Sequence, residues 1–128
     1  TWDKAIAGDS MMLSGSRSCF TVEAVDEETA RRVNEFDINP TAPLCGRGEP
    51  MVSAEAAEIE VATLDDWQGW IKGLEKAGMD ATRRAMRVGV PDLTWQWDGD
   101  DQLMLAFSLP PGSYATAVLR ELGRFAVP

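Results

Sequence analysis

The 128-residue sequence predicts an α+β fold, and three patterns support this expectation. Bulky apolar side chains fall at every second position over residues 103–109, which is the period of a β-strand. Pro110 and Pro111 then stop the strand because neither has a backbone N–H, and Ser113 is placed to cap the helical pattern that follows. The remaining pattern is a hairpin followed by two helices, over residues 11–25, 53–61 and 63–78.

The first third of the chain is expected to form a hairpin, a short helix and a long loop. The arms of the hairpin lie within residues 11–25, on either side of a Ser-Gly-Ser-Arg turn. Acidic residues at 26–28 favour the positive end of a helix, and two arginines one turn later are typical of a solvated helix face. Residues 37–48 contain two prolines and two glycines and are expected to be irregular, with a Gly-Arg-Gly tip that is either an anion-binding turn or a plain surface loop.

Two consecutive helices are expected in the middle of the chain. Ser53 is the expected cap of the first, whose inward positions would be Ala56, Ala57 and Val61. Thr63 is the expected cap of the second, with Asp66 at the third helical position. The second helix carries an apolar stripe, which such spacing predicts to be core: Trp67, Trp70, Ile71 and Leu74.

The last third of the chain has strand character over residues 88–90 and 93–97. Trp95 and Trp97 share one face of the second of these strands. Residues 98–101 contain three aspartates but lack the EF-hand pattern and its closing glutamate, so they are interpreted as the polar turn of a hairpin.

Composition limits the class of protein. With 45% apolar and 26% charged residues, the chain has enough material for a core without disulfides or metal, and its length fits one domain or one domain and a piece of another. Cys19 and Cys45 are far apart and are expected to be buried thiols of a cytoplasmic protein, with a bridge possible but not implied. No membrane association is expected, since no apolar run approaches the ~20 residues that span a bilayer. The sequence opens at Thr1 in mid-pattern, which suggests a fragment, although a processed terminus would look the same.

Charge and the lack of histidine restrict the chemistry further. The chain has no histidine, which excludes Ser-His-Asp and Cys-His pairs and histidine metal sites within it. A net charge of −9 argues against a dedicated nucleic-acid binder, because neutralising phosphates requires clustered cations. The densest basic group is Arg83, Arg84 and Arg87, which either neutralises phosphates or balances the acids of the preceding helices.

The segment SLPPGSYATAVLREL at residues 108–122 resembles the C-terminal motif of the TruD family of tRNA pseudouridine synthases, in which a strand leads through Leu-Pro-Ala-Gly-Ser-Phe/Tyr-Ala-Thr into a helix. On spacing alone, an ordinary strand–turn–helix unit with Tyr114 in the core is the better explanation, because such units are common. The side-chain identities favour the family. Pro111 stands where the family often has alanine, and Tyr114 where phenylalanine is frequent.

The resemblance extends over nearly the whole chain, from about Gly8 to Gly123. Three further segments match the family in the expected order: GDSMMLSGSRSCFTVE, ETARRVNEFDINPTAPLCGRGE and ATRRAMRVGVPDLTWQW. The resemblance implies a partial pseudouridine synthase core, a β-hairpin plus helix, joined to part of an α/β insertion domain. Residues 1–92 would be the later part of that insertion domain, and residues 93–128 the C-terminal return to the catalytic domain.

The activity implied by the resemblance is the conversion of uridine to pseudouridine in the tRNA D-arm, without a cofactor or a metal. The family's catalytic aspartate lies in a Gly-x-Lys-Asp segment that this sequence lacks. No catalytic residue is therefore expected here, and the chain alone is expected to be inactive. The implied partners are tRNA and the missing N-terminal part of the same enzyme, and the fragment is expected to be able to self-associate.

The resemblance also implies substrate-binding roles. Tyr114 would pack against the target uracil, and Arg120 would pair with the catalytic aspartate, although a surface ion pair would explain Arg120 as well. Ser113 and the free amides of the helix start would bind a phosphate or base oxygen. Arg83, Arg84 and Arg87 would be the weaker RNA contacts.

The alternative is a free-standing RNA-docking or protein-interaction module without catalysis. Such a module would cover the apolar side chains of residues 93–109 from within the chain. A fragment would leave them uncovered.

Overall fold

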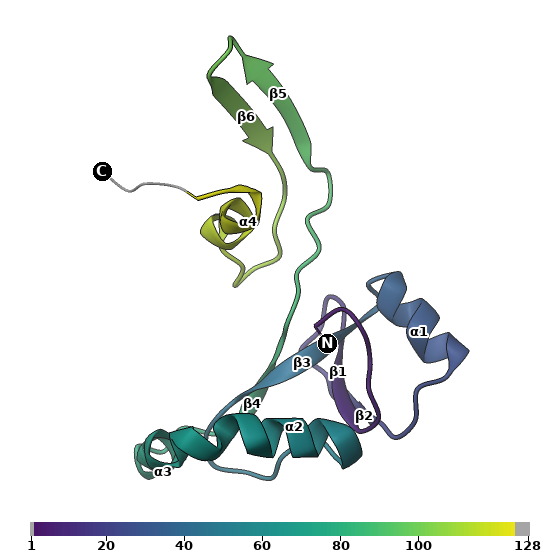
Figure 1. Cartoon of the computed structure of the whole chain (residues 1–128), viewed down its shortest axis with the longest axis vertical. Helices are drawn as coiled ribbons and strands as arrows, with labels where there is room; N and C mark the ends of the chain where they lie inside the picture. Colours follow the sequence, from purple (N-terminus) through teal and green to yellow (C-terminus); the bar gives the residue numbers. More distant parts are fainter. Residues whose placement is uncertain (1, 125–128) are drawn as a thin grey trace. The chain divides into compact units, whose positions relative to one another are not determined.

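The computed structural model describes residues 2–124 and divides the chain into two compact units, Thr1–Arg87 and Val88–Pro128 (Figure 1). The first unit contains β1 (Asp9–Leu13), β2 (Cys19–Val22), α1 (Glu27–Asn34), β3 (Ile38–Leu44), α2 (Ala54–Leu64), the 3₁₀ helix η1 (Asp65–Trp67), α3 (Gln68–Lys76) and β4 (Thr82–Ala85). The second contains β5 (Thr94–Asp98), β6 (Gln102–Ala106) and α4 (Ala115–Leu122). The predicted α+β class is confirmed.

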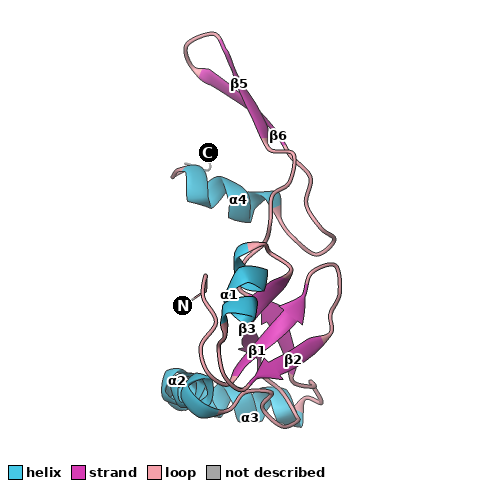
Figure 2. Ribbon diagram, turned by 90° about the vertical axis from the view of Figure 1, so that its right-hand side faces the viewer, coloured by secondary structure: helices cyan, strands magenta, loops and turns pink. Residues whose placement is uncertain are grey.

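An antiparallel sheet in the order β2-β1-β3-β4 organises the first unit. Its apolar face and α1 enclose a small core made by Met11, Val22, Val33 and Ile38. Figure 2 shows α1 beside the sheet, with α2 and α3 together at one end of it. The core is small because the other face of the sheet is polar.

The polar face carries buried hydrogen-bonding side chains. Met12 pairs with Asn39, and strand alternation puts both on the face opposite Met11. Thr41 Oγ1 donates to the Ser10 carbonyl oxygen at 2.5 Å. Asn39 Oδ1 accepts from Arg87 Nε at 2.8 Å. Side chains from β3 and from the end of the first unit thus satisfy one another on this face.

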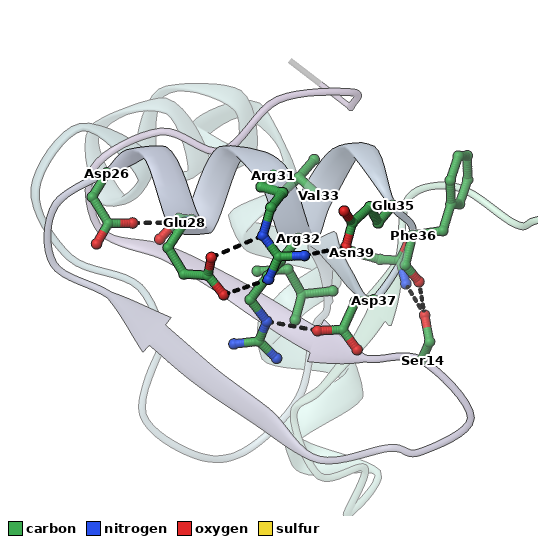
Figure 3. A network of polar contacts seen from close by, with 12 residues as sticks. Ser14, Asp26, Glu28, Arg31, Arg32, Val33, Glu35, Phe36, Asp37 and Asn39 are labelled. Atoms are coloured by element: carbon green, nitrogen blue, oxygen red, sulfur yellow. Dashed lines mark hydrogen bonds and ion pairs between the residues drawn. The ribbon is translucent and has the colours of Figure 1, made fainter.

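The short helix α1 has the expected solvated surface (Figure 3). The Asp26 side chain caps it by accepting from Thr29 N at 2.7 Å. Arg31 pairs with Glu28 at 2.7 Å and with Glu35 at 2.5 Å, and all three side chains are more than half exposed. These contacts order the helix surface, while burial of Val33 attaches the helix to the sheet.

The expected loop over residues 37–48 is wrong for most of its length, because residues 38–44 form β3. The first half of β3 pairs with β1 and the second half with β4, so the two prolines are held in a strand by partners distant in sequence. The predicted strand at residues 88–90 is absent, and β6 ends at Ala106 instead of Leu109. Both cysteines are free and partly exposed, so the expected burial is also wrong.

The two middle helices exist, but several expected details are wrong. The chain passes from α2 through η1 into α3 without a cap at Thr63, and the Ser53 side chain makes no capping bond. Val61 is 70% exposed and Trp70 is 74% exposed, so neither belongs to the core. Helical periodicity identified the helices correctly but did not show which face is covered.

Gly8 is required by a close approach of two backbones. Its φ is +82°, and a Cβ at this position would lie 1.8 Å from the Ser53 carbonyl oxygen.

We expect Gly8→Ala to lower the free energy of unfolding by more than about 2 kcal/mol, since the left-handed conformation alone costs ~1–2 kcal/mol and the clash adds to it. Urea unfolding followed by circular dichroism measures this. The control is Gly15→Ala, where φ is +71° but the space is open; equal losses at the two positions would contradict the prediction.

Asp9 gives the fold a defined pH dependence. It is buried, and burial raises the pKa of its carboxyl, while the Ile6 amide that donates to Oδ2 at 3.0 Å and the charge of Arg83 oppose this. A raised pKa means that the folded state binds the proton more tightly, so ionised Asp9 destabilises the fold at neutral pH.

We therefore expect Asp9→Asn, which keeps an acceptor and removes the charge, to be more stable than the parent chain at pH 7. The difference should disappear as the pH falls towards about 3.9, the ordinary value for aspartate. Urea unfolding between pH 7 and pH 4 tests this, with the exposed Asp66→Asn as the control. A difference that grows at low pH would contradict it.

Candidate functional site

The hairpin of β5 and β6 presents an apolar face. Trp95 pairs with Leu105 and Trp97 with Leu103, so the two tryptophans and their partners lie on the same side of the ladder. Gly99, with φ at +72°, lies in the turn between the strands. The predicted hairpin and the shared face of the tryptophans are confirmed.

The other described residues of the second unit do not cover this apolar face. Trp95 is 66% exposed and Tyr114 is 68% exposed, while Phe107 is half-buried. None of the described residues of the second unit, 88–124, is fully buried. Within the second unit, the apolar edge of the hairpin is therefore exposed.

The joint between β6 and α4 holds the Tyr114 ring at the surface. Gly112 adopts a φ of +86°, and Ser113 N donates to the Pro110 carbonyl oxygen at 3.1 Å. Tyr114 is the N-cap residue, in extended conformation, and its carbonyl oxygen accepts from Ala117 N at 3.0 Å. Ser113 was expected to cap this helix, but the N-cap residue is Tyr114, one position later.

No side chain caps α4, which leaves amides of its first turn available to an anion or a carbonyl oxygen. Arg120 lies in the last turn and is exposed. Six residues separate Tyr114 from Arg120, about 9 Å along a helix axis and roughly 120° around it. The helix alone therefore does not bring these two side chains together.

The three arginines predicted as an RNA patch do not share one surface. Arg83 and Arg87 lie on the polar face of the sheet, whereas alternation directs Arg84 to the opposite side, where it is exposed. Arg83 forms an ion pair with Glu60 of α2 at 2.5 Å, and the two side chains are only 4% and 18% exposed. For Arg83, this contact matches the second of the two alternatives raised by the sequence, in which the arginines balance the acids of the preceding helices.

Arg87 is bound within the first unit. Its guanidinium donates to the carbonyl oxygens of Val33 and Ile38, the latter at 3.1 Å, as well as to Asn39. It also lies 4.1 Å from the centroid of the Phe36 ring. Burial lowers the pKa of this guanidinium. These contacts account for Arg87 structurally.

A cavity of about 310 Å³ lies in the first unit between the end of β3, the loop that follows it, and the helices α2 and α3. The helical wall carries Leu64, Gln68, Ile71 and Glu75, at steps of three or four residues. This cavity was not predictable from the sequence, because its other wall comes from residues 43–51, which carry no such period.

The Gly-Arg-Gly tip forms part of that other wall and is neither of the two free turns considered from the sequence. Arg47 Nη2 pairs with Asp80 Oδ1 at 2.7 Å, and Arg47 N donates to the Met79 carbonyl oxygen at 2.7 Å. A Cβ at Gly46 would lie 2.6 Å from that same carbonyl oxygen. The tip therefore docks tightly on the segment between α3 and β4.

Comparison with known proteins gives the family. Residues 1–122 match the TruD family, described as tRNA pseudouridine synthase D. The chain is 41% identical over 125 residues to tRNA pseudouridine synthase D of Methylococcus capsulatus, covering 98% of this chain and 35% of the relative. It is 48% identical over 124 residues to the same enzyme of Xanthomonas campestris pv. campestris, covering 95% of this chain and 34% of the relative.

A crystal structure of a TruD protein from Methanosarcina mazei superposes with a TM-score of 0.65 at 28% identity, covering 94% of this chain and 31% of that one. The chain therefore belongs to the TruD family. It spans about one third of the length of these relatives. Among the described residues, no helix has the length and apolarity needed to cross a bilayer.

The buried Arg83–Glu60 pair predicts a large structural effect. Arg83→Met should lower the free energy of unfolding by about 3–5 kcal/mol, because it leaves the Glu60 carboxylate buried without its partner. The double variant Arg83→Met/Glu60→Leu should recover part of this loss, since both charges are removed. Chemical denaturation of both variants tests the prediction, with Arg31→Met as an exposed control expected to change little. A double variant less stable than Arg83→Met would contradict it.

Proposed function

We propose that this chain is the C-terminal part of a tRNA pseudouridine synthase, which isomerises uridine to pseudouridine in the tRNA D-arm. Family membership supports the activity, and the observation that carries the proposal for this part of the enzyme is the exposed Tyr114 ring at the start of α4, in the same unit as the exposed apolar hairpin. In this reading, residues 1–92 belong to the insertion domain and residues 93–128 to the catalytic domain.

The reaction explains why an exposed ring suits this place. Isomerisation breaks the bond between uracil and ribose, rotates the base and rejoins it through carbon, which requires the base to leave its stack. An aromatic side chain can then hold the extruded base by stacking, worth about 1–3 kcal/mol per base. We assign this role to Tyr114. We propose that Ser113 and the free amides at the start of α4 bind a phosphate or base oxygen of the substrate.

The rest of the active site would come from other parts of the enzyme. The Gly-x-Lys-Asp segment that carries the family's catalytic aspartate is not in this sequence, and we propose that Arg120 keeps this aspartate ionised in the whole protein. The net charge of −9 requires the basic groove for tRNA to be elsewhere as well. Within this chain, Arg83, Arg84 and Arg87 are proposed only as weaker RNA contacts, and Arg83 and Arg87 are also bound within the first unit.

The uncovered hairpin face would be buried against the missing N-terminal part of the enzyme, and in isolated chains against a second copy. A non-catalytic module is the weaker alternative, because such a module should cover Trp95 and Tyr114 itself.

Two measurements test the proposed function. The isolated 128-residue chain, incubated with unmodified tRNA, should form no pseudouridine, because it lacks the catalytic aspartate; robust turnover would refute the assignment. In the whole enzyme, Tyr114→Ala should lower kcat/KM about 5- to 150-fold, the factor that corresponds to one lost stacking contact. Tyr114→Phe, which keeps the ring, is the matched control and should retain most of the activity. Equal losses in both variants would show that stacking is not the role of this residue.

A further inference from the structure

The cavity beside α2 and α3 has apolar walls. At about 310 Å³, it is at the lower end of the range of ligand pockets. Apolar side chains from both walls line it: Pro43, Leu44, Pro50, Met51, Leu64 and Ile71. Its size suits one or two large apolar side chains of a partner.

The rim of the cavity is acidic. Glu49 and Glu75 line it, are exposed, and form no ion pair with any residue in the described range. The one cation among the lining residues, Arg83, is 4% exposed and is already paired with Glu60. The rim therefore repels phosphate groups and attracts ammonium or guanidinium groups.

The two acids lie on different walls of the cavity. Glu49 belongs to the wall of residues 43–51 and Glu75 to the helical wall. A ligand that fills the cavity and pairs with both must therefore carry apolar groups and more than one cation. The neighbouring Trp67 and Trp70 do not line the cavity, because successive residues of a helix are turned by about 100°.

We propose that this cavity binds a polypeptide segment in which apolar side chains alternate with lysine or arginine. The apolar side chains enter between Leu64, Ile71 and Met51. The cations lie against Glu49 and Glu75. This site is independent of the Tyr114 site and of the proposed isomerase activity.

Cys45 allows a direct test, because it lines the cavity, whereas Cys19 lies on β2 and does not. The probe is the peptide acetyl-Leu-Lys-Ile-Arg-Leu-amide, and its matched control is acetyl-Leu-Glu-Ile-Glu-Leu-amide. We expect the basic peptide to slow iodoacetamide alkylation of Cys45 at least fivefold in the 128-residue chain, with no change at Cys19. The acidic peptide should protect neither thiol.

Charge variants define the contact further. Glu49→Gln/Glu75→Gln should raise the Kd of a fluorescent form of the basic peptide about fivefold at low salt, consistent with two solvent-exposed ion pairs. Glu58→Gln, on exposed α2 surface outside the cavity, should leave the Kd unchanged. Circular dichroism establishes that each variant folds, and the comparison of the two peptides needs no variant. Equal protection by the two peptides, no protection by either, or protection of Cys45 by an oligouridine would each overturn the proposal.

Discussion

The ion pair between Arg83 and Glu60 joins two parts of the first unit that the chain itself separates by more than twenty residues. Arg83 also donates to Thr41, from both Nε and Nη2 at 2.8 Å, so one guanidinium links α2, β3 and β4. Because both charges are withdrawn from water, each depends on the other for its solvation. This contact, together with the backbone approach of Gly8 to Ser53, holds α2 against the sheet and so maintains the cavity whose wall α2 provides.

The two faces of the sheet in the first unit differ in character, because one is apolar and the other is polar. Only a few side chains on the α1 side form an apolar core, and Ser10 Oγ, on the opposite side, is buried with no hydrogen-bond partner among residues 2–124. Satisfied polar contacts therefore contribute much of the specificity of this fold. Such contacts are directional, so they define one arrangement of β3 and β4 more sharply than apolar packing of this size would.

Features encoded within about ten residues were predictable from the sequence. The acidic residues at 26–28 and the two arginines one turn later identified α1, and the alternation before Pro110 identified the strand that leads to Tyr114. The strand β3 was not predictable, because its pairing is supplied by β1 and β4, and its prolines suggested a loop. Trp67 and Trp70 were placed in the core, since a helical stripe does not reveal whether the chain provides anything to cover it. The cavity was not predictable for the same reason, because its walls come from segments that are distant in sequence and meet only in the folded structure.

The pairing of β5 with β6 constrains how the turn between them can change. Asp98 lies opposite Gln102, and with this register Trp97 and Trp95, two residues apart, lie on one side of the hairpin. Inserting or deleting one residue in this turn would shift the alignment by one and send the indoles to the reverse side. Apart from Gly99, whose backbone favours glycine, the turn can therefore accept substitutions in its side chains much more readily than any alteration of its length.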